Sequence, residues 1–219
     1  MATRALLAEL CEAYAAHAAT TVHVESVGGV DAAKRLRAGE SFDFTVLAAD
    51  AIAQLAAEGH VVAGSERALA HSGIAVAVPK GARQPDISTE EAVRLAVLAA
   101  PSIGYSTGPS GTALMKLFER WGIAGELKER LVQAPPGVPV GSLVARGDVA
   151  LGFQQLSELM HRDDIAVVGD LPAAIQINTT FTAAVCRASQ QQEAAARFCR
   201  FLASADAAPH ITRQGMTPA

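Results

Sequence analysis

Hydrophobic positions recur along the chain at two spacings, one typical of helices and the other of buried strands. Leu7, Leu10, Cys11 and Tyr14 fall on one helical face and predict a helix over about residues 3–16. Similar patterns predict helices near residues 31–38, 51–58, 88–100, 110–121, 126–131, 140–146, 154–158, 189–203 and 207–213. Apolar, β-rich runs predict strands at residues 22–27, 42–49, 73–78, 102–105, 149–153, 165–168 and 174–185.

This alternation of strands and helices predicts an α/β fold with mainly parallel sheets. It occurs twice, before and after Lys80, which indicates two lobes. The long apolar runs at 73–78 and 175–185 are expected to cross between the lobes. We therefore expect lobe 1 to comprise residues 1–78 plus 183–219, and lobe 2 to comprise residues 79–182.

Polar residues and glycines indicate where several helices begin and end. Asp50 is expected to cap the helix that follows it, and Gly39 to end the helix before it. Ser88 and Glu91 have the spacing of a capping box.

Composition narrows the function classes. Half of the residues are apolar but only 5% are aromatic, and the net charge of -4 argues against general nucleic-acid binding. No apolar run is long enough for a membrane span, so we do not expect membrane insertion. The chain has an odd number of cysteines, widely spaced at Cys11, Cys186 and Cys199, so we expect no disulfide framework. The histidines show no metal-binding spacing, so we expect no metal or cofactor site.

The compartment depends on where the natural chain starts. The amino terminus as given lacks the basic region, apolar core and cleavage site of a secretory signal. We expect a periplasmic protein if a signal peptide precedes this sequence, and a cytoplasmic protein if the sequence is complete.

The stretch from Ser102 to Thr112 is the most informative single segment. An apolar strand leads into a loop of Gly, Ser and Thr residues, and an amphipathic helix follows. Free N–H groups and the positive end of the helix dipole converge at such a helix start, which predicts a binding site for an anion.

The same stretch permits a second interpretation. Residues 104–108 spell G-x-S-x-G, the nucleophile motif of α/β-hydrolases, with Asp170 and His210 downstream in the matching order. Pro109 delays the helix after Ser106, however, and no oxyanion-hole segment is recognisable, so a serine hydrolase is a distant alternative.

Five polar turns follow predicted strands, at residues 28–30, 48–50, 106–112, 138–139 and 154–155. In open α/β sheets such turns line the ligand crevice. This pattern makes Ala49, Ser106 and Thr107 candidate binding residues alongside those named below.

The order of these elements resembles the molybdate-binding-protein-like branch of the type II periplasmic solute-binding proteins. The resemblance covers nearly the whole chain and is carried by Leu36–Asp50, Val76–Gly81, Gly108–Thr112, Gly152–Glu158 and Gln214–Pro218. It implies two α/β lobes, joined by two crossing strands, that close on a small anion. It also implies an ABC transporter permease as a partner.

Carried over by position, the family's ligand contacts fall at Gly29, Val30, Ser110, Gly111, Val138 and Gln155. Molybdate binders place Tyr at the position of Gln155 and Ser at the turn of Gly29 and Val30. The amide and the wider site favour an organic carboxylate over molybdate.

The same branch includes aconitate isomerases, so an isomerase of an aconitate-like tricarboxylic acid is the alternative function. Moving a proton requires a general base, for which the candidates are Asp50, His71 and Glu158. We favour a binding protein over an enzyme.

Overall fold

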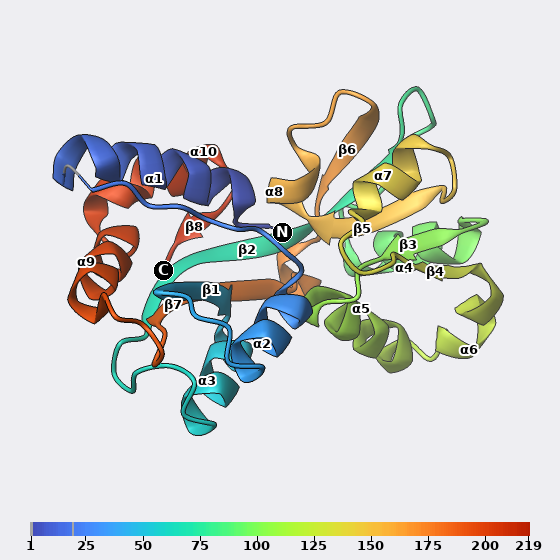
Figure 1. Cartoon of the computed structure of the whole chain (residues 1–219). Helices are drawn as coiled ribbons and strands as arrows, with labels where there is room; N and C mark the ends of the chain where they lie inside the picture. The colour runs from blue at the N-terminus through green and yellow to red at the C-terminus, as the bar shows by residue number, and fades with distance from the viewer. Residues whose placement is uncertain (1, 19) are drawn as a thin grey trace. The chain divides into compact units, whose positions relative to one another are not determined.

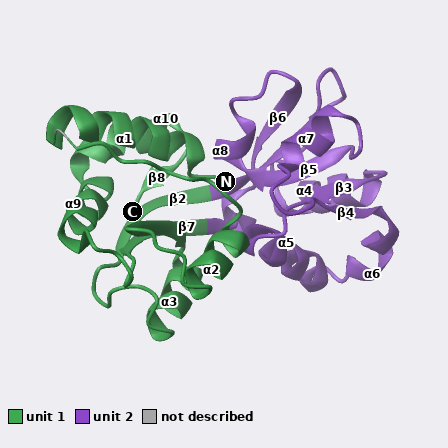
Figure 2. Cartoon of the chain, in the orientation of Figure 1, with its two compact units in different colours: residues 1–72, 179–219 green, residues 73–178 purple. Residues whose placement is uncertain are grey.

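A computed structural model describes residues 2–18 and 20–219 (Figure 1). The chain forms two compact units, residues 1–72 with 179–219 and residues 73–178 (Figure 2). The chain passes between the units within β2 (Arg67–Pro79) and at the start of β7 (Asn178–Val185). Both boundaries, after Ser72 and after Asn178, lie a few residues earlier than the sequence indicates.

Unit 1 contains the first half of β2 and most of β7, next to β1 (Phe44–Ala48) and β8 (Thr217–Pro218). β7 lies between β1 and β2, and β8 pairs with β2. Its α-helices are α1 (Arg4–Ala18), α2 (Gly29–Arg37), α3 (Ala49–Ala57), α9 (Gln192–Leu202) and α10 (Ala208–Arg213).

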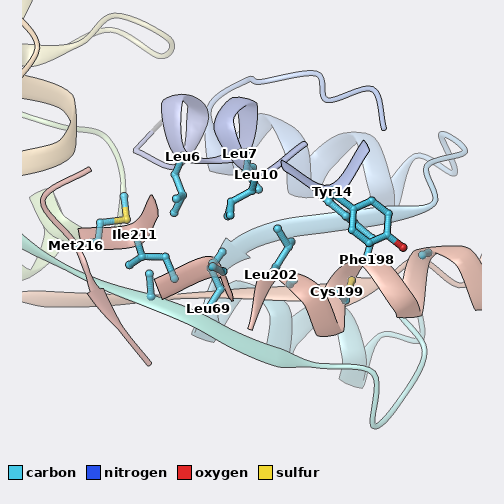
Figure 3. Packing of buried hydrophobic residues seen from close by; sticks show 14 of the residues in the cluster. Leu6, Leu7, Leu10, Tyr14, Leu69, Phe198, Cys199, Leu202, Ile211 and Met216 are labelled. Atoms are coloured by element: carbon cyan, nitrogen blue, oxygen red, sulfur yellow. The ribbon is translucent and has the colours of Figure 1, made fainter. Parts of the chain in front are cut away.

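The helices of unit 1 cover both faces of its sheet. On one face, apolar side chains of α1 point toward Leu69 of β2, Leu202 of α9 and Ile211 of α10 (Figure 3). On the other face, Leu36 of α2 and Leu55 of α3 pack in a separate buried cluster with residues of β1 and β7. The helical periodicity of the sequence is therefore explained by burial against this sheet.

Unit 2 contains the second half of β2 with β3 (Ile103–Tyr105), β4 (Leu131–Gln133), β5 (Leu151–Gln155) and β6 (Ile165–Asp170). Its α-helices are α4 (Glu90–Ala99), α5 (Pro109–Arg120), α6 (Ala124–Leu127), α7 (Val140–Ala145) and α8 (Leu156–Leu159). The strands run in the order β2-β5-β3-β4, and β6 also pairs with β2.

The fold is α/β, as predicted, and the sheet is mixed. β3 pairs parallel with β4 and β5, whereas β2 pairs antiparallel with β5, β6 and β8, and β1 antiparallel with β7. In unit 2, α4 and α5 pack on one face of the sheet, and α7 and α8 on the other.

One expected strand is absent from the structure, and two short strands were not expected. Residues 20–28 form no strand, and Val24 is exposed, because β-branched residues need a neighbouring strand that this segment lacks. The strands β4 and β8 were missed because they are too short to show a period, and β4 begins at Leu131, where a helix was expected to end.

Several element ends also differ from the expectations. Thr89, not Ser88, caps α4, since its Oγ1 accepts a hydrogen bond of 3.1 Å from the Ala92 N–H. Asp50 lies inside the first turn of α3, whose N-cap is Ala48. The segment expected to be a strand from residue 174 begins as the short 3-10 helix η2 (Ala173–Ile175), and β7 starts only at Asn178.

Candidate functional site

The candidate site in unit 2 lies where β5, β3 and β4 end. These three neighbouring strands are parallel, so their carboxyl ends share one edge of the sheet. Ser106 follows β3, the turn containing Val138 follows β4, and Gln155 ends β5. The structure therefore brings together, at one edge, the residues that the sequence predicted in three separate turns.

The first turn of α5 presents unpaired donors at this edge. Its N-cap, Gly108, provides no side-chain cap, and Pro109 occupies the first turn. Thr112 N–H donates to the Gly108 carbonyl oxygen at 3.1 Å, whereas the N–H groups of Ser110 and Gly111 have no partner within residues 2–18 and 20–219. Two N–H groups and the positive end of a twelve-residue helix are thus available to an anion.

Gly111 makes this arrangement possible. A Cβ atom built there would lie 1.9 Å from the carbonyl oxygen of Ser106, so any side chain would force the backbone apart. The hydroxyl oxygens of Ser106 and Ser110 are 2.9 Å apart and share a hydrogen bond. The loop and the start of the helix therefore pack directly on one another, while Thr107 is exposed.

Gln155 adds a buried amide on the same side of the sheet. It pairs with Ile74, whose side chain packs under α4 and α5, so the Gln155 side chain lies on the face that α5 covers. Gln155 is only 5% exposed, and Oε1 has no hydrogen-bond partner among the described residues. A buried acceptor without a partner is costly, which favours a contact with a hydrogen-bond donor here.

Gln154 and Glu158 form a polar chain on the opposite face. The Gly141 N–H in the first turn of α7 donates to Gln154 Oε1 at 3.0 Å, and Gln154 Nε2 donates to Glu158 Oε2 at 2.8 Å. Burial raises the pKa of the Glu158 carboxyl above its usual range, and the hydrogen bond from Gln154 opposes that rise. Glu158 thus combines partial burial with a fixed orientation, as a general base requires.

The backbone N–H of Val138 is used within its own turn. Its N–H donates to the Pro135 carbonyl oxygen at 3.0 Å and is not free for a ligand. Its side chain packs beside the apolar cluster under α7.

The candidate residues of unit 1 lie at the starts of α2 and α3. Neither helix has a side-chain cap, and a Cβ on Gly29 would lie 3.7 Å from the Leu47 side chain, just before α3. Val30 and Asp50 are exposed, and Ala49 is half-buried. These two nearby helix starts supply N–H donors, but the first turns also carry acidic side chains.

The remaining candidates have other partners. His71 Nδ1 lies 2.9 Å from Thr180 Oγ1 on the neighbouring strand, and Asp170 ends β6 in an exposed position. His210 Nδ1 lies 3.1 Å from Glu9 Oε2. With Ser106 bonded to Ser110 and α5 starting only at Pro109, the geometry of a serine hydrolase is absent from the described residues.

No group of three or more His, Cys, Asp or Glu residues suited to a metal ion occurs within the described part of the chain. No described helix is both long and apolar enough to cross a membrane. Burial raises the pKa of Cys186 to about 12 and that of Cys199 to about 11, so both thiols stay protonated near neutral pH.

Two residues at this edge lie in segments that the sequence singled out, but they were not named as site residues. Gln154 holds Glu158, and Ser157 has a buried hydroxyl, 7% exposed at the residue level, without a partner among the described residues. The signal was the run of polar residues, Gln154 to Glu158, directly after an apolar strand.

The family model described as bacterial extracellular solute-binding protein matches residues 1–217. A curated relative, an aconitate isomerase from a Pseudomonas species, is 39% identical over 187 residues, which cover 84% of this chain and 70% of the relative. The periplasmic molybdate-binding protein of Azotobacter vinelandii has a similar fold, with a TM-score of 0.81, 19% identity and coverage of 98% of this chain and 95% of that protein. A tungstate ABC transporter structure from Geobacter sulfurreducens gives a TM-score of 0.75 and 14% identity, covering 95% of this chain and 92% of that one.

Proposed function

The chain belongs to the bacterial extracellular solute-binding protein family and has the type II periplasmic binding protein fold, and from this premise we propose that it binds a small organic acid with several carboxylates. The observation that carries the proposal is the uncapped start of α5, which Gly111 holds against Ser106 at the sheet edge where Gln155 ends β5. Backbone N–H groups, hydroxyls and an amide are donors suited to carboxylate oxygens.

Two considerations favour an organic acid over molybdate. Gln155 replaces the tyrosine expected of molybdate binders and offers both a donor and an acceptor, which suits a ligand with several unlike oxygen groups. The relative at 39% identity is named for aconitate, a tricarboxylate. We propose delivery to an ABC transporter permease as the purpose of binding, in keeping with the family.

Thermal unfolding with a ligand panel tests this proposal. Molybdate, tungstate, sulfate, citrate, cis-aconitate and trans-aconitate should be compared at equal ionic strength. A ligand at 100 times its Kd adds about 2.7 kcal/mol of stability, which raises Tm by roughly 5–11 °C for a chain of this size. We expect stabilisation by the organic acids and not by the oxyanions. Stabilisation by molybdate alone would contradict the proposal.

The identity to an aconitate isomerase favours a second candidate function, isomerisation of aconitate. Of the three candidate bases, Glu158 is supported best, because burial raises the pKa of its carboxyl and Gln154 fixes its orientation. Glu158 would take a proton from the substrate methylene carbon as the double bond shifts, and return one to the former vinyl carbon.

Incubation with either aconitate isomer, followed by chromatography, distinguishes the two candidates. An isomerase should interconvert the isomers, and Glu158→Gln should abolish the reaction while leaving the thermal shift by aconitate in place. A wild-type protein that binds aconitate without converting it would be a binding protein only.

A further inference from the structure

The amide oxygen of Gln155 is a buried acceptor that the fold leaves unused. Gln155 is 5% exposed, and its Oε1 has no hydrogen-bond partner within the part of the chain that the structure describes. The adjacent Gln154 differs, because its buried amide accepts from the Gly141 N–H and donates to Glu158. An unpaired buried carbonyl oxygen is unfavourable, so we expect a donor from outside the described residues at Gln155.

The packing between β5 and α5 shows which way Gln155 points. Leu151 and Phe153 of β5 share a buried cluster with Leu114 and Phe118 of α5, and the Phe118 and Phe153 rings meet edge to face at 6.1 Å between centroids. Side chains two positions apart on a strand point to the same face, so Gln155 continues this row toward the carboxyl end of β5. Gln155 therefore lies on the side of the sheet that α5 covers.

The first turn of α5 lies near the same edge as Gln155. The helix is part of the crossover between the parallel strands β3 and β4, so it runs opposite to them and to β5, which is parallel to β3. Along the strand direction, Ser110 lies about 12 Å beyond Phe118, and Gln155 lies about 7 Å beyond Phe153. The difference of about 5 Å is a distance that one small acid can span.

We propose that the ligand carries a hydroxyl group beside its carboxylates, and that this hydroxyl donates to Gln155 Oε1. The ligand class is then the hydroxy carboxylic acids. This inference rests on the proposed function, because it assigns a carboxylate of the same molecule to the first turn of α5. A hydroxyl suits a neutral amide oxygen, whereas a buried ammonium group would need a compensating charge. The acidic side chain nearest in sequence, Glu158, is held by Gln154 on the opposite face.

Citrate and tricarballylate test the hydroxyl directly, because tricarballylate is citrate without its hydroxyl group. The dissociation constants of both acids should be measured by isothermal titration calorimetry on the wild-type protein and on Gln155→Met. We expect the wild-type protein to bind citrate about tenfold more tightly, as for one added hydrogen bond. In Gln155→Met this preference should disappear. Loss of the amide N–H would weaken both acids alike and cancel from the ratio.

The stability of the ligand-free protein supplies a second readout. Gln214→Met is the matched control, because Gln214 is 6% exposed and its amide donates to Glu9 within unit 1. Gln214→Met should lower Tm and keep the preference for citrate. Gln155→Met should leave Tm unchanged or raise it, since it removes an unpaired acceptor.

The outcomes separate this inference from the proposed function. Equal wild-type affinities for citrate and tricarballylate, or a citrate preference that survives in Gln155→Met, would overturn the inference alone. A Tm loss in Gln155→Met as large as that in Gln214→Met would mean that Oε1 already bonds a structural water, and would also overturn it. A wild-type protein that binds neither of these acids nor aconitate would overturn the proposed function, and this inference with it.

Discussion

Replacing Gly111 by alanine is the sharpest test of how the start of α5 is built. The added Cβ would lie 1.9 Å from the Ser106 carbonyl oxygen, 2.9 Å from its carbonyl carbon and 3.2 Å from its Oγ. The first two are backbone atoms and cannot rotate away, so the helix start and the loop must separate. Gly108→Ala is the matched control three residues earlier, since nothing lies within 4 Å of its Cβ and its φ of -85° suits alanine.

Overpacking of a buried position costs about 1–3 kcal/mol, and the backbone contact puts Gly111→Ala near the top of that range. At about 2–4 °C per kcal/mol for a chain of this length, Tm should fall by roughly 6–12 °C. Gly108→Ala should cost no more than about 1 kcal/mol, because its only penalty is that alanine is a poorer N-cap than glycine. Differential scanning calorimetry measures both.

Ligand binding gives the second half of this test. Separation of α5 from Ser106 would displace the N–H groups of Ser110 and Gly111, so aconitate should no longer shift the Tm of Gly111→Ala. Equal Tm values and equal aconitate responses for the two alanine variants would refute the reasoning.

Three further predictions concern stability. Thr89→Ala should lower the free energy of unfolding by about 1 kcal/mol through loss of the α4 cap, whereas Ser88→Ala should lower it by less than half of that. Urea denaturation of both variants measures these changes. Gln176→Leu should lower the free energy of unfolding by about 2–3 kcal/mol, because the Gln176 amide accepts from the N–H (2.9 Å) and donates to the carbonyl oxygen (3.2 Å) of buried Ile74. The control Gln190→Leu, at an exposed position, should be nearly neutral in the same assay. Burial opposes ionisation of Glu9, but hydrogen bonds from His210, Arg213 and Gln214 outweigh it and lower the pKa of Glu9. The ionised group therefore stabilises the fold above about pH 4.5, and this stabilisation is lost as the pH falls through the pKa of the folded state. Glu9→Gln should lower Tm at pH 7 and weaken the fall of Tm with decreasing pH; an unchanged pH profile of Tm would contradict the assignment.

The sequence predicted elements well where a buried face imposes a period. The helices α1, α5 and α9 were predicted because each packs an apolar stripe on a sheet. The strand expected at residues 22–27 was wrong, because a strand forms only beside a partner strand, and no local pattern in the sequence reveals that partner. The cap of α4 was misplaced by one residue, since adjacent Ser88 and Thr89 both suit an N-cap and only the fold decides between them.

For the site, the sequence predicted the loop from Ser106 to Gly111 and the position of Gln155. It did not predict that the Val138 N–H is taken by Pro135, or that Gln154 connects α7 with Glu158. These contacts join segments from different turns, so they depend on strand order and on which face each side chain takes. The unpaired state of Ser157 was hidden for the same reason, because it is a property of its surroundings.

The most direct test of the central claim is a ¹⁵N–¹H nuclear magnetic resonance titration of the wild-type protein with trans-aconitate. We predict saturable shifts of the Ser110 and Gly111 backbone amide signals, together with the Gln155 side-chain amide, because these groups would donate to the bound acid. Aconitate binding that leaves these three signals unmoved, or the absence of any shift at millimolar aconitate, would contradict it.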